Sequence, residues 1–130
     1  MGRVLLYNFT EETRRKKVKA ELFRMGLPSE EIPPSAQAHV LGYLLKAEDC
    51  TPAPEPPENP FREEMIVMYG LTPRQFHGFL DGLKRQGVRV PLKAVVTEHN
   101  IRWSSLQLRD ELMKEAEAVQ QRTSIHGNNR

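Results

Sequence analysis

Three short apolar runs, each leading toward a helix-start signal, constrain the fold of this chain more than any other feature. They span residues 3–9, 65–69 and 92–96. Nearly continuous apolar runs of this length are typical of strands that are buried on both faces of a sheet. Because these strands alternate with helical patterns, they predict an α/β fold with helices on both sides of the sheet.

The helix boundaries are marked by capping residues. Gly26 and Gly87 are placed to end two helices in the left-handed conformation that a Schellman motif requires. Trp103 stands just before the last helix, at the spacing from Leu108 that is typical of a hydrophobic staple. We expect four helices, which begin after the capping residues Thr10, Ser35, Thr72 and Ser104.

The domain organisation follows from these elements. The proline-containing stretch 27–34 is left open as a weak edge strand around Ile32, and the proline-rich stretch 49–60 predicts an extended surface connector. We predict a single α/β domain over residues 1–120, followed by a flexible C-terminal tail over 121–130. The domain is expected to be a small three-layer sandwich, in which a mostly parallel sheet of three to four strands is flanked by four helices.

Composition limits the environment of the chain. A hydrophobic fraction of 38% with 28% charged residues fits a soluble globular protein, and no apolar run approaches the ~20 residues of a membrane helix. The single cysteine, Cys50, excludes an internal disulfide and fits a reducing compartment. The chain enters its first strand without a secretory signal, so we expect a cytoplasmic protein without membrane contact.

Polar residues follow the predicted strands at the points where those strands end. Open α/β sheets bind ligands at the carboxyl ends of their strands. The candidate binding rim therefore consists of Asn8, Tyr69, Gly70, Thr97, His99, Asn100 and Trp103. The competing interpretation is structural, with Asn100 as a turn former and Trp103 as the staple of the last helix.

A basic run lies on the first predicted helix. This candidate basic patch consists of Arg14, Arg15, Lys16, Lys17 and Lys19, which are suited to contact phosphates. The competing interpretation is a solvated helix face with ion pairs such as Glu12 with Lys16, one turn apart. The net charge of +2 and the absence of interleaved aromatic residues disfavour nucleic acid as a partner.

The sequence lacks the familiar cofactor and catalytic motifs. Its first strand-to-helix turn carries two glutamates and no glycine where a phosphate would bind. Its four histidines lack the i, i+4 pairing of a helical zinc site. We therefore expect no cofactor and no metal. An enzymatic alternative is limited to acid–base or transfer chemistry around Lys93, His99 and Asn100.

Several motifs together resemble a known family. They are the runs Val4–Phe9 and Met65–Gly70, the segment Leu41–Leu44, and the stretch from Leu92 to Thr97 followed by Asn100 and Trp103. In these motifs, over residues 3 to about 117, the chain is similar to a small bacterial family known as domain of unknown function 3783. The resemblance implies the same core and no established activity. It also implies a family motif made of Asn8, Gly42, Tyr43, Lys93, Thr97, Asn100 and Trp103. The long proline connector and His99 are not read as shared features.

The observations together predict a non-catalytic α/β module that binds a partner protein or a small-molecule ligand at the rim. Two alternatives stay open: a small enzyme, and a nucleic-acid-associated protein that uses the helix carrying Arg14–Lys19. Self-association stays open as well, because it depends on the apolar area that the folded domain exposes.

Overall fold

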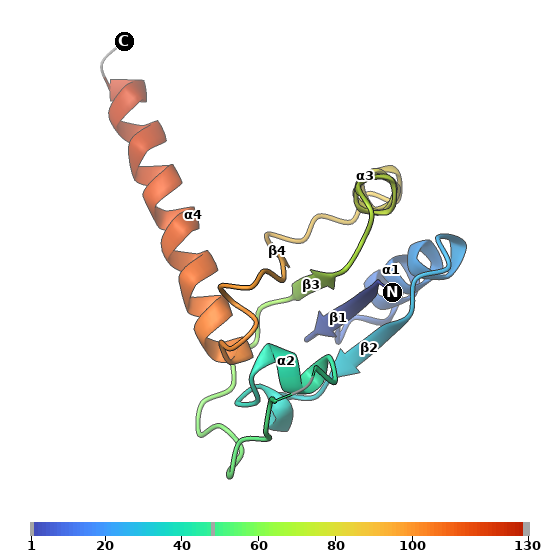
Figure 1. Ribbon diagram of the computed structural model, residues 1–130. Helices are drawn as coiled ribbons and strands as arrows, with labels where there is room; N and C mark the ends of the chain where they lie inside the picture. Colours follow the sequence, from blue (N-terminus) through green and yellow to red (C-terminus); the bar gives the residue numbers. More distant parts are fainter. Residues whose placement is uncertain (1, 48, 129–130) are drawn as a thin grey trace.

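Figure 1 shows the computed structural model of the chain, which describes residues 2–47 and 49–128, with side chains up to Val119. The strands are β1 (Arg3–Tyr7), β2 (Ser29–Ile32), β3 (Met65–Tyr69) and β4 (Leu92–Val95). The helices are α1 (Glu12–Arg24), α2 (Leu41–Leu44), α3 (Pro73–Arg85) and α4 (Ser105–Asn128), with a 3₁₀ turn at Pro34–Ala36. The predicted α/β class is confirmed, and β2 is the fourth strand that the sequence left open.

The four strands form one mixed sheet in the order β2-β1-β3-β4. The pairs β1–β2 and β3–β4 are parallel, whereas the two central strands, β1 and β3, are antiparallel. The prediction of a mostly parallel sheet is corrected accordingly. The chain leaves β2 at Ile32, which pairs with Tyr7, and enters β3 at Met65, which pairs with the same residue. A strand that starts at the end of the sheet where the previous strand finished must run back in the opposite direction.

Each face of the sheet has its own hydrophobic core, because successive side chains of a strand point to opposite faces. One core lies under α1 and α3 and contains Val4, Leu6, Val18, Leu22, Ile66, Met68, Phe79 and Leu83. The other lies under α2 and α4 and contains Leu5, Tyr7, Leu41, Phe61, Met65, Val67, Leu92 and Leu108. The three-layer arrangement is therefore confirmed, with helices on both sides of the sheet (Figure 1).

The fold contains the same strand–helix–strand unit twice. The units β1-α1-β2 and β3-α3-β4 each form a parallel strand pair, and their helices cover the same face. A residue with positive φ follows the first strand of each unit: Asn8 at 63° and Gly70 at 68°. Because the central strands are antiparallel neighbours, an approximate two-fold rotation relates the two units.

Both unit helices end in the predicted Schellman motif. Gly26 and Gly87 have φ of 68° and 70°. The N–H of Leu27 donates to the carbonyl of Leu22 at 2.9 Å, and the corresponding bond in α3, from Val88 to Leu83, is 3.0 Å long. Glycine is required at these positions because a Cβ is strained at such φ values.

The two helices contact each other at equivalent positions. Glu21 of α1 faces Gly82 of α3, and a Cβ on Gly82 would overlap the Glu21 carboxylate. Glu21 is only 5% exposed, yet it accepts hydrogen bonds from Gln86 at 2.9 Å and from Arg24 at 2.8 Å. The bonds from Gln86 and Arg24 hold the pKa of Glu21 below its usual value, although burial opposes them. The contact is therefore a charged clamp rather than a purely apolar seam.

The start of α1 differs from the prediction. Glu11, and not Thr10, caps this helix, since its carboxylate accepts hydrogen bonds from the N–H groups of Thr13 and Arg14. Thr10 is held outside the helix because its N–H donates to the carbonyl of Asn8 in a tight turn. The N-terminus of α1 is thus already occupied by a carboxylate of the protein itself.

The helix predicted after Ser35 is shorter than expected and begins at Leu41. Val40 forms an isolated antiparallel bridge with Ser104, and this extended conformation prevents an earlier start. The predicted caps of the other two helices are present. Thr72 forms a complete capping box with Gln75, and the hydroxyl of Ser104 accepts a hydrogen bond from the N–H of Gln107.

Helix α4 packs on the sheet through its first turns and then projects beyond the body of the domain (Figure 1). Its backbone is helical to Asn128, so the helix is longer than the predicted domain. A flexible tail is predicted over 121–130. The side chains of this stretch and residues 129–130 lie outside the described part of the chain, so the tail stays a prediction. The connector over 49–60 contains neither helix nor strand.

Candidate functional site

The mixed sheet divides the predicted rim. Asn8 follows Tyr7, which pairs with Met65 at the start of β3, whereas Tyr69 ends β3 beside Arg3. Asn8 therefore lies at the opposite end of the central strands from Tyr69 and its neighbour Gly70. Thr97 stays at the same end as Tyr69, because β3 and β4 lie side by side and parallel as predicted.

Thr97 and Asn100 build the turn that follows β4. The hydroxyl of Thr97 accepts hydrogen bonds from the N–H groups of His99 and Asn100, each 3.2 Å long. The side chain of Asn100 accepts from the N–H of Thr97 at 2.8 Å and donates to the carbonyl of Val95 at 3.1 Å. These polar groups are satisfied within the loop, so both residues act as its scaffold.

Two pairs of rings in contact lie on the surface near this loop, one pair tilted and the other edge-to-face. The rings of His99 and Trp103 have centroids 5.2 Å apart, and those of His39 and Tyr43 have centroids 4.7 Å apart. His99 is exposed, Tyr43 is 37% exposed, and the other two are half-buried. We call these four residues the aromatic surface. The predicted rim did not include His39 and Tyr43, although they repeat the spacing of His99 and Trp103 and the family resemblance pointed to Tyr43.

Backbone hydrogen bonds fix the two parts of the aromatic surface relative to each other. The N–H of Leu41 donates to the carbonyl of Trp103, and that of Gly42 donates to the carbonyl of Ile101, both at 2.8 Å. Gly42 is required here because a Cβ would overlap Cys50 Sγ. Trp103 also packs in the core with Leu108, as the staple predicts. The aromatic surface is therefore attached to a rigid frame.

The proline connector is tied to the aromatic surface as well. The N–H of Ala53 donates to Nδ1 of His39 at 2.8 Å. Because Nδ1 accepts this bond, the neutral ring of His39 carries its proton on Nε2. The hydrogen bond places the connector beside the ring pair of His39 and Tyr43.

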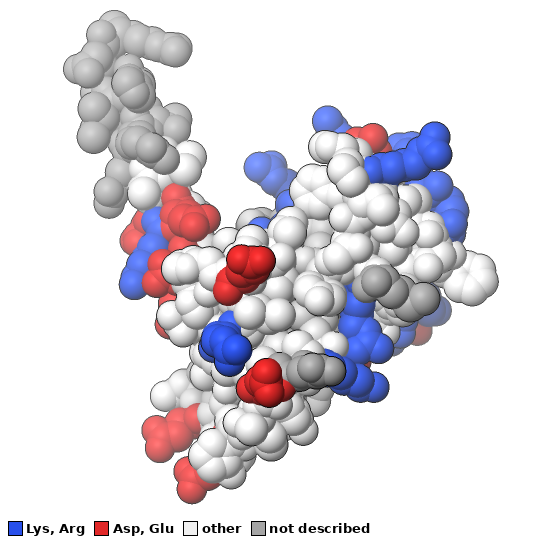
Figure 2. Space-filling view, viewed as in Figure 1, with Lys and Arg blue, Asp and Glu red and all other residues white. Residues whose placement is uncertain are grey.

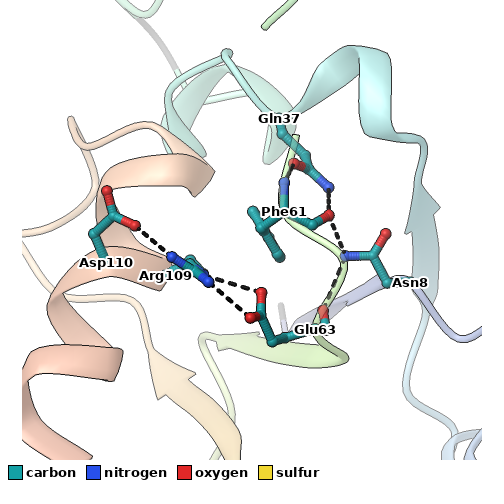
Figure 3. Close-up of polar contacts among 6 residues, drawn as sticks. All are labelled: Asn8, Gln37, Phe61, Glu63, Arg109 and Asp110. Atoms are coloured by element: carbon teal, nitrogen blue, oxygen red, sulfur yellow. Dashed lines mark hydrogen bonds and ion pairs between the residues drawn. The ribbon is translucent and has the colours of Figure 1, made fainter. Parts of the chain in front are cut away.

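Figure 3 shows the polar contacts at the other end of the sheet, where Asn8 lies. Its amide donates to the carbonyls of Phe61 and Glu63, each at 2.9 Å. The side chain of Gln37 accepts from the N–H of Phe61 at 2.8 Å and donates to its carbonyl at 3.2 Å. Asn8 and Gln37 thus hold the end of the connector as it enters β3, which is a structural role.

An ion pair fastens α4 to the same place. Arg109 forms two hydrogen bonds with the carboxylate of Glu63, at 3.0 and 2.7 Å, and a third with Asp110 at 2.9 Å (Figure 3). The hydrogen bond from Arg109 holds the pKa of Glu63 below its usual value, and Glu63 in turn raises the pKa of Arg109. These charges neutralise each other instead of facing a ligand.

The candidate basic patch is largely paired with acidic groups of the same molecule. The ion pairs are Arg14–Glu64 at 2.6 Å, Lys16–Glu12 at 3.1 Å and Lys19–Glu31 at 2.9 Å. Lys17 donates to the carbonyl of Gln86. Figure 2 shows the basic side chains over the α1 and α3 side of the molecule and acidic side chains along α4. These contacts favour the interpretation as a solvated helix face.

The residues of the enzymatic alternative do not converge. Lys93 pairs with Ile66 in the sheet, so its side chain is on the α1 and α3 face. The ring of His99 instead contacts Trp103, which packs on the other face. Asn100 is used in its turn, and no described hydrogen bond reaches the ring of His99. Between residues 2 and 119, leaving out residue 48, no group of three or more metal-ligating side chains is found.

Comparison with known proteins identifies one family. Residues 64–119 match the model of the family described as Domain of unknown function (DUF3783). The family resemblance is therefore confirmed over this stretch, which comprises β3, α3, β4 and the described side chains of α4. Searches of the curated proteins and of the solved structures gave no match. In the described part of the chain, no helix is both long and apolar enough to cross a membrane.

Proposed function

We propose that this domain is a protein-binding module whose partner docks on the aromatic surface of His39, Tyr43, His99 and Trp103. The observation that carries the proposal is the pair of contacting rings on each of two segments that hydrogen bonds hold together. Tryptophan and tyrosine are enriched at protein interfaces and among the residues that dominate binding energy.

The rigidity of the frame supports this function. The turn scaffold of Thr97 and Asn100 and the bridge between Val40 and Ser104 fix the backbone before a partner arrives. A surface that is already ordered loses less conformational entropy on binding than a mobile one. Rings presented on the surface suit a protein partner, whereas a small ligand is usually bound in a deep apolar pocket.

The test places a photo-crosslinking amino acid at Tyr43 in cells that produce the protein, identifies the crosslinked protein, and measures its binding by calorimetry. Tyr43→Ala and His99→Ala should each weaken binding by about 10- to 30-fold, the effect of removing an interface anchor. These two side chains are chosen because they are more exposed than Trp103, which also supports the core.

Phe23→Ala is the matched control, because Phe23 is 88% exposed on α1, the helix on the other side of the sheet. Its affinity should equal that of the wild type. The proposal is wrong if Phe23→Ala weakens binding as much as Tyr43→Ala, or if both aromatic-surface variants bind the crosslinked protein with unchanged affinity.

A further inference from the structure

A separate cavity of about 420 Å³ lies between the C-terminal half of α3 and β4. It is lined by Leu80, Leu83, Lys84, Gly87, Val88, Arg89 and Lys93. Its volume is within the range of small-ligand sites. It lies on the face of the sheet covered by α1 and α3, away from the core that includes Trp103.

The cavity combines an apolar floor with a basic rim. Leu83 and Val88 are 3% and 6% exposed and belong to the core. Lys84, Arg89 and Lys93 are exposed around this floor, and no acidic residue lines the cavity. Apolar and cationic groups are thus concentrated at one place.

These three cations lack an ion-pair partner among the described side chains. The Lys93 ammonium donates to the carbonyl of Val90, which leaves two of its three protons for another acceptor. Partial burial, and then the nearby Arg89, lower the pKa of Lys93. A bound anion would offset both effects.

The cations are also not needed to cap the end of α3. The N–H groups of Gln86, Gly87 and Val88 already donate to three carbonyls in the last turn of that helix, those of Gly82, Lys84 and Leu83. The position of Arg89 is fixed independently, because Arg14 donates to its carbonyl at 2.8 Å while pairing with Glu64. The backbone that carries Arg89 is therefore held in place beside the cavity.

We propose that this cavity binds a small carboxylate that carries an apolar chain. The carboxylate lies between Lys84, Arg89 and Lys93, and the chain covers Leu83 and Val88. Charge complementarity decides the class of ligand, since a basic rim without acidic residues selects an anion. The apolar floor selects an anion with a hydrocarbon body over a fully hydrated one. This site is independent of the proposed protein-binding surface.

The probe for this site is sodium decanoate below its micelle concentration, titrated into the purified full-length protein by calorimetry. Lys93→Gln and Arg89→Gln should each weaken decanoate binding by about tenfold, the effect of losing one charged hydrogen bond. Lys46→Gln is the matched control, because Lys46 follows α2 and lines a different surface hollow. Its decanoate affinity should be unchanged, and circular dichroism checks that each variant is folded.

Two further probes separate the parts of the recognition. Decanol, with the same chain and no charge, and acetate, with the same charge and no chain, should both bind more weakly than decanoate. Equal binding of decanol, equal binding of acetate, or unchanged affinity in both rim variants would overturn the proposal. Tyr43→Ala should bind decanoate normally, so failure of this site and failure of the protein-binding function are distinguishable.

Discussion

The two strand–helix–strand units have the same architecture, but the residues at equivalent positions of their first strands make different contacts with the rest of the chain. In the first unit, Asn8 occupies the left-handed position and its amide binds the returning connector. In the second unit, Gly70 occupies the equivalent position and supplies the turn without a side chain. The comparison shows that the same left-handed conformation can form only a turn, as at Gly70, or can form a turn whose side chain also binds the connector, as at Asn8. We call this side-chain contact the tether.

The tyrosines that precede these residues differ in the same way. Tyr7 is fully buried, and its hydroxyl is 2.6 Å from that of Ser105 at the start of α4. Burial raises its pKa well above the usual value, although the bond to Ser105 opposes the rise. Tyr69 is half-buried and forms no such bond with a described side chain. The first unit thus fastens both the connector and α4.

The largest difference between the units is expected at their left-handed residues. Asn8→Ala should lower the free energy of unfolding by about 2–4 kcal/mol. It removes the Asn8 donor from the carbonyls of Glu63 and Phe61, of which Phe61 keeps only the bond from Gln37, and it places an alanine at φ 63°. Urea denaturation measures the change. Asn8→Gly removes the donor without the strain and should cost less, whereas Gly70→Asn should change stability by less than about 1 kcal/mol.

Equal losses in Asn8→Gly and Gly70→Asn would show that the tether contributes nothing and that only the turn conformation matters. That result would remove the distinction between the two units at this position.

A smaller effect is expected at the tyrosines. Tyr7→Phe should lower the free energy of unfolding by about 1–2 kcal/mol, because the buried hydroxyl of Ser105 loses its partner. Tyr69→Phe is the matched change in the second unit and should stay within about 0.5 kcal/mol of the wild type. Thermal unfolding followed by circular dichroism compares the two variants. If Tyr69→Phe were the more damaging, the assignment of the tether to the first unit would be reversed.

The smallest expected effect lies at the clamp between the units. The folded-state pKa of Glu21 is below its usual value of 4.5, so its charged form stabilises the fold above that pH. This stability should be lost as the pH falls below about 4.5 and through the folded-state pKa. Glu21→Gln should lower the urea midpoint at neutral pH and make it decline less steeply on acidification than in the wild type.

Glu12→Gln is the control for the clamp, because Glu12 lies on the same helix with an exposed side chain. Its stability should follow the wild-type pH dependence. An acid profile of Glu21→Gln that matches the wild type would show that the clamp carries no charge-dependent stability.

Local signals in the sequence were sufficient for most of the fold. The apolar runs, Gly26, Gly87 and the Thr72 capping box predicted elements whose conformation depends on neighbouring residues. The direction of β3 depends on where a connector of many residues returns to the sheet, and the sequence near β3 does not encode that. The mixed sheet was therefore outside the reach of local patterns.

The candidate site was predicted only in part for the same reason. His99 and Trp103 were found because they follow a strand, and the structure places them in the aromatic surface. Their neighbours His39 and Tyr43 come close through backbone hydrogen bonds between segments that are distant in the sequence. Asn8 was included on the assumption of parallel strands, and the antiparallel centre moves it to the opposite end of the central strands.

The antiparallel centre of the sheet has a consequence for the stretch that matches the family model. Residues 64–119 contain β3 and β4 but not β1, which covers the hydrogen-bonding edge of β3. A polypeptide limited to that stretch would therefore leave one edge of β3 without a hydrogen-bonded neighbour. Two such polypeptides, joined β3 to β3 about a dyad, would rebuild the four-stranded arrangement that the present chain achieves within a single molecule.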